Sequence, residues 1–131
     1  GLKAFNDFYS KLGLHISDIS VVDASGVSQN DLVTANWMSL ALVKLSKNQS
    51  FQTYKNTLAV PSEAGTLQNR LSKLSGRLYA KTGTNAGVSA IVGFVTDKGG
   101  NNFAFSIIIQ NFKDSSKPAK ELENSILQVF E

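Results

Sequence analysis

Two apolar segments in the second half of the chain constrain the fold more than any other feature. They are Val88–Thr96 and Asn102–Gln110, both rich in Val, Ile and Phe, and the turn-forming run Asp97–Gly100 separates them. β-Branched and aromatic runs that meet at such a turn are typical of a β-hairpin. The preceding segment, Arg77–Thr84, is predicted to add a third strand, so the sequence favours an antiparallel sheet of three or more strands.

The segments around these strands have apolar residues at helical spacing. Thr34 is predicted to cap one of these helices. The last helix has Leu122, Ile126, Val129 and Phe130 along one side. The sequence therefore predicts an α+β fold, in which helices, including a C-terminal helix, pack on the sheet. In chain order, the predicted helical segments are Leu2–Leu12, Ala35–Ser46, Phe51–Leu58, Gly65–Leu71 and Ala119–Phe130.

The size and composition of the chain indicate a single domain that spans residues 1–131. Its 131 residues are 42% apolar and 18% charged, which excludes wholesale disorder. The absence of cysteine excludes disulfides and thiolate metal sites. The net charge of +3 is modest and no cluster of Lys and Arg with interleaved aromatic residues occurs, so no nucleic-acid partner is indicated.

The residues with the clearest chemical content are Lys81–Thr84, the tetrad Lys-Thr-Gly-Thr on the first predicted strand. Alternate side chains share a face of a strand, so Thr82 and Thr84 point one way and Lys81 the other, unless strand twist or an edge position lets Lys81 lean around. Gly83 has no side chain where another backbone would approach. A cation, two hydroxyls and an open strand suit a peptide that ends in a carboxylate. The alternative is a surface lysine beside turn residues.

The sequence around the tetrad, KTGTNAGVSAIVGFVT followed by FAFSIIIQN, resembles the serine-type D-alanyl-D-alanine carboxypeptidases of the penicillin-binding superfamily. Within this superfamily it is similar to the low-molecular-mass class C enzymes, the S13-type peptidases. Two upstream segments match the same branch in the same order, Val22–Ser28 and Ala64–Leu67 with Arg70. Ala24 and Gln29 depart from the family's pattern, so the loop that carries them is interpreted as a structural turn beside the site.

The resemblance implies a transpeptidase-like fold and a role for each residue of the tetrad. In these roles, the charge of Lys81 acts on proton transfer in the site and on the carboxylate of the substrate. The substrate-binding residues are Thr82, Gly83 and Thr84, and the backbone N–H of Thr84 is an oxyanion-hole donor. The implied partners are peptidoglycan stem peptides ending in D-Ala-D-Ala and, for the full-length protein, β-lactam antibiotics. The implied location is periplasmic or otherwise extracytoplasmic, in the bacterial cell envelope. Acyl transfer of this kind needs no metal or organic cofactor.

The nucleophile of such an enzyme is missing from these residues. No serine is followed by a lysine three positions later, whereas the family's acyl-enzyme mechanism uses a Ser-x-x-Lys pair. Ser28-Gln29-Asn30 has the form of the family's Ser-x-Asn motif, but it falls downstream of the turn that the motif should precede, so we interpret it as chance. We therefore expect a C-terminal fragment of a larger catalytic domain, inactive by itself toward D-Ala-D-Ala peptides and not labelled by penicillin.

The resemblance also predicts an exposed sheet edge. The family's sheet has five strands, two of which come from the N-terminal part, so Asn102–Gln110 is expected to present an unpaired apolar edge. Such an edge invites pairing with another chain, which predicts a homodimer.

Two other functions stay open at this point. One is a non-catalytic peptide- or cell-wall-binding module that keeps the Lys-Thr-Gly strand, and the other is a β-lactamase-type relative, which the flanking matches disfavour. The sequence also leaves open whether carboxypeptidase or endopeptidase activity dominates.

Overall fold

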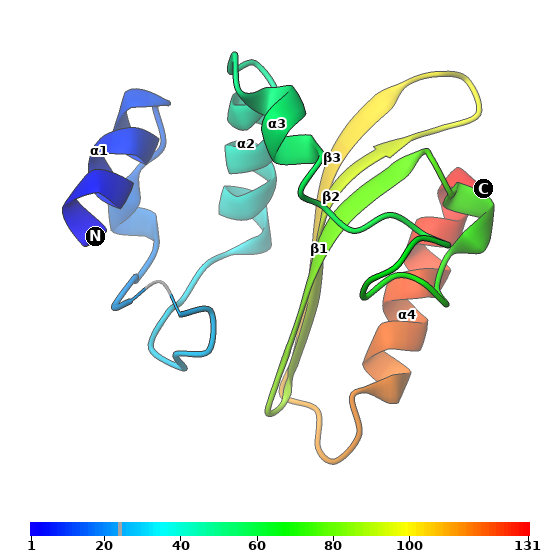
Figure 1. Ribbon diagram of the computed structural model, residues 1–131. Coiled ribbons are helices and arrows are strands. Elements are labelled where there is room, and N and C mark those ends of the chain that lie inside the picture. The colour runs from blue at the N-terminus through cyan, green and yellow to red at the C-terminus, as the bar shows by residue number, and fades with distance from the viewer. Residues whose placement is uncertain (24) are drawn as a thin grey trace.

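The computed structural model describes residues 1–23 and 25–131, and it contains one antiparallel sheet with helices on both faces (Figure 1). The strands are β1 (Leu78–Asn85), β2 (Val88–Thr96) and β3 (Asn102–Gln110), in the order β1-β2-β3. The α+β class and the three strands are confirmed, with β1 beginning and ending one residue later than the sequence predicts. Ala24, one of the two departures from the family's pattern, lies outside the described residues.

Both connections within the sheet are tight. Residues 86–87 join β1 to β2, and Gly87 has φ +68°, a left-handed conformation that favours glycine. Residues 97–101 join β2 to β3, and the Asp97 carboxylate accepts hydrogen bonds from the backbone and side-chain nitrogens of Asn101, both at 2.9 Å. Hydrogen bonds from the Asn101 side chain, and then from its backbone, lower the pKa of Asp97. The predicted hairpin and its turn are confirmed.

Three helices lie on one side of the sheet (Figure 1). They are α1 (Leu2–Lys11), α2 (Ala35–Leu45) and α3 (Phe51–Lys55), and α2 lies between α1 and the sheet. The first two are confirmed, and the third is shorter than the predicted Phe51–Leu58. None of the helices in the described ranges has both the length and the apolar character needed to cross a bilayer.

A small core joins α1 to α2. The Thr34 side chain caps α2, as predicted, by accepting a hydrogen bond from the backbone N–H of Trp37 at 3.0 Å. Trp37 and Ala41 are buried, and the Trp37 ring centroid lies 5.2 Å from that of Tyr9 on α1. These contacts hold α1 on the face of α2 that is turned away from the sheet.

The segment before β1 corrects one prediction. The sequence predicts a helical turn over Gly65–Leu71, but residues 61–70 form turns and bends, and a short 3-10 helix follows at Ser72–Leu74. Leu71 has φ +55° and Gly65 has φ +138°, and an α-helix has neither angle. The segment still contributes to the core, because Leu67 is fully buried.

The C-terminal helix α4 (Lys117–Leu127) covers the opposite face of the sheet, and a 3-10 turn at Gln128–Phe130 extends it (Figure 1). Its presence and its packing on the sheet are confirmed. Between α4, the sheet and the segment before β1 lies the main core, which consists of Leu67, Leu71, Leu74, Leu78, Ala80, Ile91, Val95 and Leu127.

The apolar side of the last helix, which the sequence places at Leu122, Ile126, Val129 and Phe130, is only partly its buried side, because Phe130 alone of the four packs against the main core. Leu122, Ile126 and Val129 are 51%, 45% and 79% exposed, although their spacing places them on one apolar side. A helical pattern of apolar residues predicts that a glutamate faces solvent. A glutamate that is paired and hydrogen-bonded can nevertheless face the core. The residues that α4 buries are Ala119, Glu123 and Leu127.

Strand β3 forms the second edge of the sheet. Across the described residues it pairs with β2 alone, so no strand covers its other side. The homodimer through this edge stays a prediction.

Candidate functional site

The tetrad lies on β1, the outer strand at one edge of the sheet. Lys81, Gly83 and Thr84 are exposed and Thr82 is half-buried. The backbone is extended through all four residues, so the tetrad is neither coiled into a helix nor enclosed. A ligand therefore has access to the four residues that the sequence singles out, and their roles stay predictions.

The backbone of the tetrad has hydrogen-bonding groups on its outer side. Ala80 points its N–H and C=O away from β2, because the N–H donates to the C=O of Ala59 at 3.0 Å and the C=O accepts from the N–H of Ala59 at 2.9 Å. Backbone groups alternate along a strand, so those of Thr82 and Thr84 also point outward, while those of Gly83 point toward β2. Past Ala80, no other strand of the described chain pairs with this side. We call the outer side of Lys81–Thr84 the open edge.

The side chains follow the same alternation. Leu78 and Ala80 are buried on the α4 face, so Thr82 and Thr84 belong to that face and Lys81 to the other. Lys81 Nζ nevertheless donates a hydrogen bond to the C=O of Thr82, which points outward. The lysine thus leans around to the open edge, where its charge lies beside the outward backbone groups.

Gly83 leaves the middle of the tetrad open. A Cβ atom at this position would have no heavy atom within 4 Å beyond its chain neighbours. Gly93 on β2 contrasts with it, because a Cβ atom there would lie 2.1 Å from the C=O of Tyr79. Gly93 is therefore required by the close approach of β1, whereas Gly83 leaves room for a ligand.

The loop around Val27 lies beside the end of β1. The side-chain amide of Asn85 donates to the C=O of Val27 at 3.1 Å. The hydroxyl of Ser28, the serine of the Ser-x-Asn sequence, accepts a hydrogen bond from the backbone N–H of Asn30 at 3.2 Å. Ser28 thus makes a local turn contact, next to the strand that carries the tetrad.

Sequence reasoning misses a buried polar cluster behind the tetrad. The hydroxyl of Ser89 donates to Glu123 Oε1 at 2.6 Å, and Arg70 Nη2 donates to Glu123 Oε2 at 2.8 Å. Ser89 is the register partner of Thr84 across the hairpin. The motif segment includes Arg70, but no local signal pairs it with a residue 53 positions later. We call Arg70, Glu123 and Ser89 the buried polar cluster.

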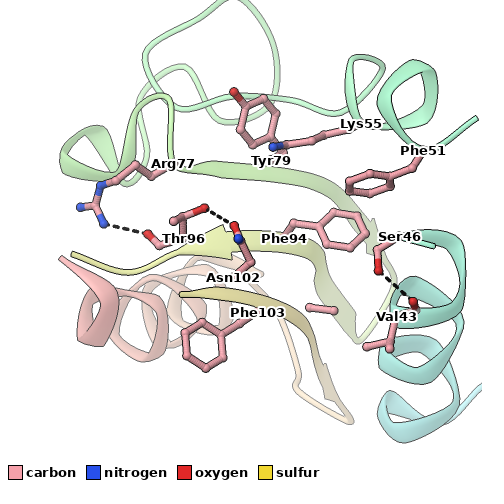
Figure 2. Close-up of a pocket in the computed structure, with 11 residues that line it drawn as sticks. Val43, Ser46, Phe51, Lys55, Arg77, Tyr79, Phe94, Thr96, Asn102 and Phe103 are labelled. Atoms are coloured by element: carbon pink, nitrogen blue, oxygen red, sulfur yellow. Dashed lines mark hydrogen bonds between the residues drawn. The ribbon is translucent and has the colours of Figure 1, made fainter. Parts of the chain in front are cut away.

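A pocket of about 460 Å³ lies on the α2 and α3 side of the sheet (Figure 2). Phe51 and Phe94 meet edge-to-face in it at 5.0 Å, and Lys55 Nζ lies 4.1 Å from the ring centre of Tyr79. Arg77, also in the lining, donates to backbone carbonyl groups. No tetrad residue lines this pocket, so the open edge, where all four tetrad residues lie, is the candidate site.

The groups at the open edge are of the kinds that suit an anion. Lys81 supplies a positive charge, and Thr82 and Thr84 supply hydroxyls and outward N–H donors, which suits a carboxylate or oxyanion on an extended peptide. Within residues 1–23 and 25–131, no group of three or more His, Cys, Asp or Glu side chains is placed to hold a metal ion.

Comparison with known proteins agrees with the resemblance. The model of the D-Ala-D-Ala carboxypeptidase 3 (S13) family matches residues 1–130. A D-alanyl-D-alanine carboxypeptidase from Actinomadura sp. (strain R39) is 36% identical over 115 residues, which cover 82% of this chain and 21% of that protein. The chain thus spans about a fifth of the length of this relative.

Solved structures have the same fold. Penicillin binding protein 4 (dacB) from Haemophilus influenzae, complexed with a β-lactam, matches with a TM-score of 0.85 at 24% identity, covering 99% of this chain and 33% of that one. A predatory peptidoglycan endopeptidase from Bdellovibrio bacteriovorus matches with a TM-score of 0.79 at 23% identity, covering 98% and 36%. The fold and the family match over nearly the whole length confirm the resemblance that the tetrad and its flanking segments indicate. The chain belongs to the D-Ala-D-Ala carboxypeptidase 3 (S13) family.

Proposed function

We propose that this chain is the substrate-gripping part of a serine D-Ala-D-Ala carboxypeptidase or endopeptidase that acts on peptidoglycan stem peptides in the bacterial cell envelope. The observation that carries the proposal is the open edge. Its outward backbone groups have no partner strand in the described chain, and Lys81 reaches the same edge. An extended peptide that ends in a carboxylate has the shape and charge for such an edge.

Each residue of the tetrad has a role in this proposal. The hydroxyls of Thr82 and Thr84 hold the terminal carboxylate, and the charge of Lys81 attracts it. The N–H of Thr84 binds the carbonyl oxygen on which negative charge develops. Gly83 lets the peptide backbone come close.

The chemical step needs a serine from outside these 131 residues, because the chain has no Ser-x-x-Lys. The serine oxygen forms an ester with the penultimate D-Ala carbonyl carbon, and the peptide C–N bond breaks. The leaving amine takes up the serine proton, and water then hydrolyses the ester. The isolated chain is therefore expected to remain unlabelled by a fluorescent penicillin, while the natural polypeptide that carries it is labelled.

Two substitutions at one position test the backbone donor. Thr84→Val removes the hydroxyl and keeps the N–H, whereas Thr84→Pro removes both, and proline is tolerated where the N–H of an edge strand faces outward. In the natural polypeptide, we expect Thr84→Pro to be acylated by benzylpenicillin about 10²–10³-fold more slowly than Thr84→Val, as for loss of one oxyanion donor. Equal rates in the two variants would contradict this role.

A matched pair of peptides tests the carboxylate grip. A stem-peptide analogue with a free D-Ala-D-Ala carboxylate should compete with penicillin labelling, and its C-terminal amide should compete far less, since each lost charge-assisted hydrogen bond costs about 1.5–3 kcal/mol. Lys81→Gln should reduce the difference in competition between the acid peptide and the amide peptide. Equal competition by acid and amide would overturn the proposal. A binding module without chemistry would bind the acid peptide and show no labelling of the natural polypeptide.

A further inference from the structure

We propose that the buried polar cluster of Arg70, Glu123 and Ser89 positions the tetrad, and that it fixes the place of Thr84 along the open edge. The proposal deepens the proposed function and rests on it for the effect on catalysis. The coupling between the cluster and the strand is a separate structural statement. The three side chains are positioning residues, since none of them belongs to the open edge itself.

The open edge depends on contacts from the rest of the sheet, because few protein groups contact its outer side. On the outer side of β1, the described chain supplies one backbone bridge, between Ala59 and Ala80. From Lys81 to Thr84, the backbone of β1 therefore pairs with β2 alone among the described residues, and the next contact on the outer side is from the Asn85 side chain to the C=O of Val27. Opposite the tetrad, the register partner of Thr84 is Ser89. Whatever holds Ser89 in place thus also holds the strand that faces a ligand.

Glu123 holds Ser89 through a restrained contact. Ser89 is 1% exposed and Glu123 is 0% exposed, so neither group has water as an alternative partner. One carboxylate oxygen accepts from the Ser89 hydroxyl and the other from Arg70. A buried carboxylate is costly unless it is paired and hydrogen-bonded, so a movement of Ser89 away from Glu123 is penalised. Hydrogen bonds also restrict distance and angle.

Arg70 ties the cluster to more of the molecule. Its Nε donates to Asn124 Oδ1 at 2.9 Å, and its Nη2 donates to the backbone C=O of Lys120 at 3.3 Å. Three segments therefore meet at one buried point behind Thr84: the turns before β1, strand β2, and helix α4. Sliding α4 along the sheet would break these directed contacts together.

Stability alone does not account for a glutamate at this inward position. Replacing a buried ion pair by apolar residues of similar volume is often neutral or stabilising. The same helix carries apolar side chains at Leu122 and Ile126, but these lie on its exposed side while Glu123 lies on its buried side. What a charged and hydrogen-bonded cluster adds over apolar contacts is a defined position for Ser89 and its neighbour on β1.

The test compares two buried hydroxyls of the same sheet. Ser89→Ala removes the hydroxyl that bonds Glu123, and Ser106→Ala removes one that has no hydrogen-bond partner among the described residues. Hydrogen exchange in the natural polypeptide is followed at the N–H of Gly83, close to Ser89, and of Tyr79, at the far end of β1; both point toward β2. We expect Ser89→Ala to speed exchange at Gly83 about tenfold or more relative to Tyr79, and Ser106→Ala to leave this ratio within about twofold.

Acylation by benzylpenicillin is the second readout. We expect Ser89→Ala to lower the acylation rate about tenfold at an unchanged folded fraction, and Ser106→Ala to leave it unchanged. Ser89→Thr keeps a hydroxyl, suits a strand, and should restore both the exchange ratio and the rate.

The outcomes separate this proposal from the proposed function. Equal acceleration at Gly83 and Tyr79, or none, would overturn the positioning role, because Ser89 would then contribute to general stability or to nothing measurable. An unaltered acylation rate in Ser89→Ala would overturn the catalytic part. If the unaltered natural polypeptide is not acylated, the proposed function fails, and the exchange ratio still decides whether the cluster positions the strand.

Discussion

The two ends of the β1–β2 hairpin are held against α4 by different chemistry. At the end near the β2–β3 turn, Leu78 and Val95 are register partners and pack in the same core as Leu127, and all three are at most 1% exposed. At the other end, beside the tetrad, the hydroxyl of Ser89 meets the carboxylate of Glu123. Apolar burial holds one end and directed hydrogen bonds hold the other.

The two ends therefore contribute differently to the stability of the fold and to the position of strand β1. Apolar burial is roughly proportional to area and has no preferred direction, so the Leu127 end supplies free energy of folding. Hydrogen bonds restrict distance and angle, so the Glu123 end restrains where the strand lies. The tetrad, which we propose binds the peptide, is therefore on the restrained half of the hairpin.

The largest effect is expected where the polar end is broken. The Arg70 side chain is only 14% exposed in its ion pair with Glu123. Glu123→Ala removes the charged partner of this nearly buried arginine and should lower the free energy of unfolding by about 3–5 kcal/mol. Glu121→Ala, an exposed glutamate on the same helix, is the control and should cost less than about 1 kcal/mol. Urea denaturation of both variants measures the difference. A loss of similar size in the two would contradict the buried pairing.

Breaking the apolar end should cost almost as much and leave the open edge in place. Leu127→Ala is expected to lower the free energy of unfolding by about 2–5 kcal/mol through lost burial and a cavity. Leu122→Ala, half exposed on the outer side of α4, should stay within about 0.5 kcal/mol. Peptide binding per folded molecule should be unchanged in Leu127→Ala. If Leu122 proves the costlier site, the assignment of the buried face of α4 is wrong.

The two glycines sharpen the comparison within one hairpin. Gly93→Ala places a Cβ atom 2.1 Å from the C=O of Tyr79 and should destabilise the chain by about 1–3 kcal/mol. Gly83→Ala places one in open space and should change stability by less than about 0.5 kcal/mol, yet weaken binding of the D-Ala-D-Ala peptide. Thermal unfolding and peptide competition measure the two effects. Undiminished binding by Gly83→Ala would argue against a ligand at this position.

The smallest effect concerns the turn at the apolar end. Hydrogen bonds from Asn101 lower the pKa of Asp97 below its ordinary 3.8, so the folded state favours the charged carboxylate. This contribution is present above pH 3.8 and is lost as the pH falls through the lowered folded-state pKa. Asp97→Ala should lower the Tm slightly at neutral pH, and the difference should vanish near pH ~2. A Tm difference that is the same at both pH values would contradict this origin.

Local patterns suffice for much of the fold. The hairpin strands are predictable because β-branched runs flank the turn at Asp97, and the start of α2 is predictable because Thr34 is a capping residue. The tetrad is found as a motif, whereas its place on an outer strand is found from the strand order of the structure.

The failed predictions depend on contacts between distant parts of the chain. Glu123 faces inward because Arg70, 53 residues earlier, and Ser89, 34 residues earlier, bind its carboxylate. A helical pattern cannot show this, since it counts only apolar spacing. Leu71 adopts φ +55°, which is uncommon for a residue other than glycine, so the helical turn predicted there does not form.

The bridge between Ala59 and Ala80 limits the length of any peptide that could pair with the outer side of β1. It closes the outer side of β1 immediately before the tetrad, and the turn after Asn85 ends the strand in the other direction. Five residues remain between these limits in the described chain, which gives an unpaired strand edge about 17 Å long at the usual rise per residue. Length by itself thus favours a short peptide tail over a long continuous strand, before any side chain is recognised.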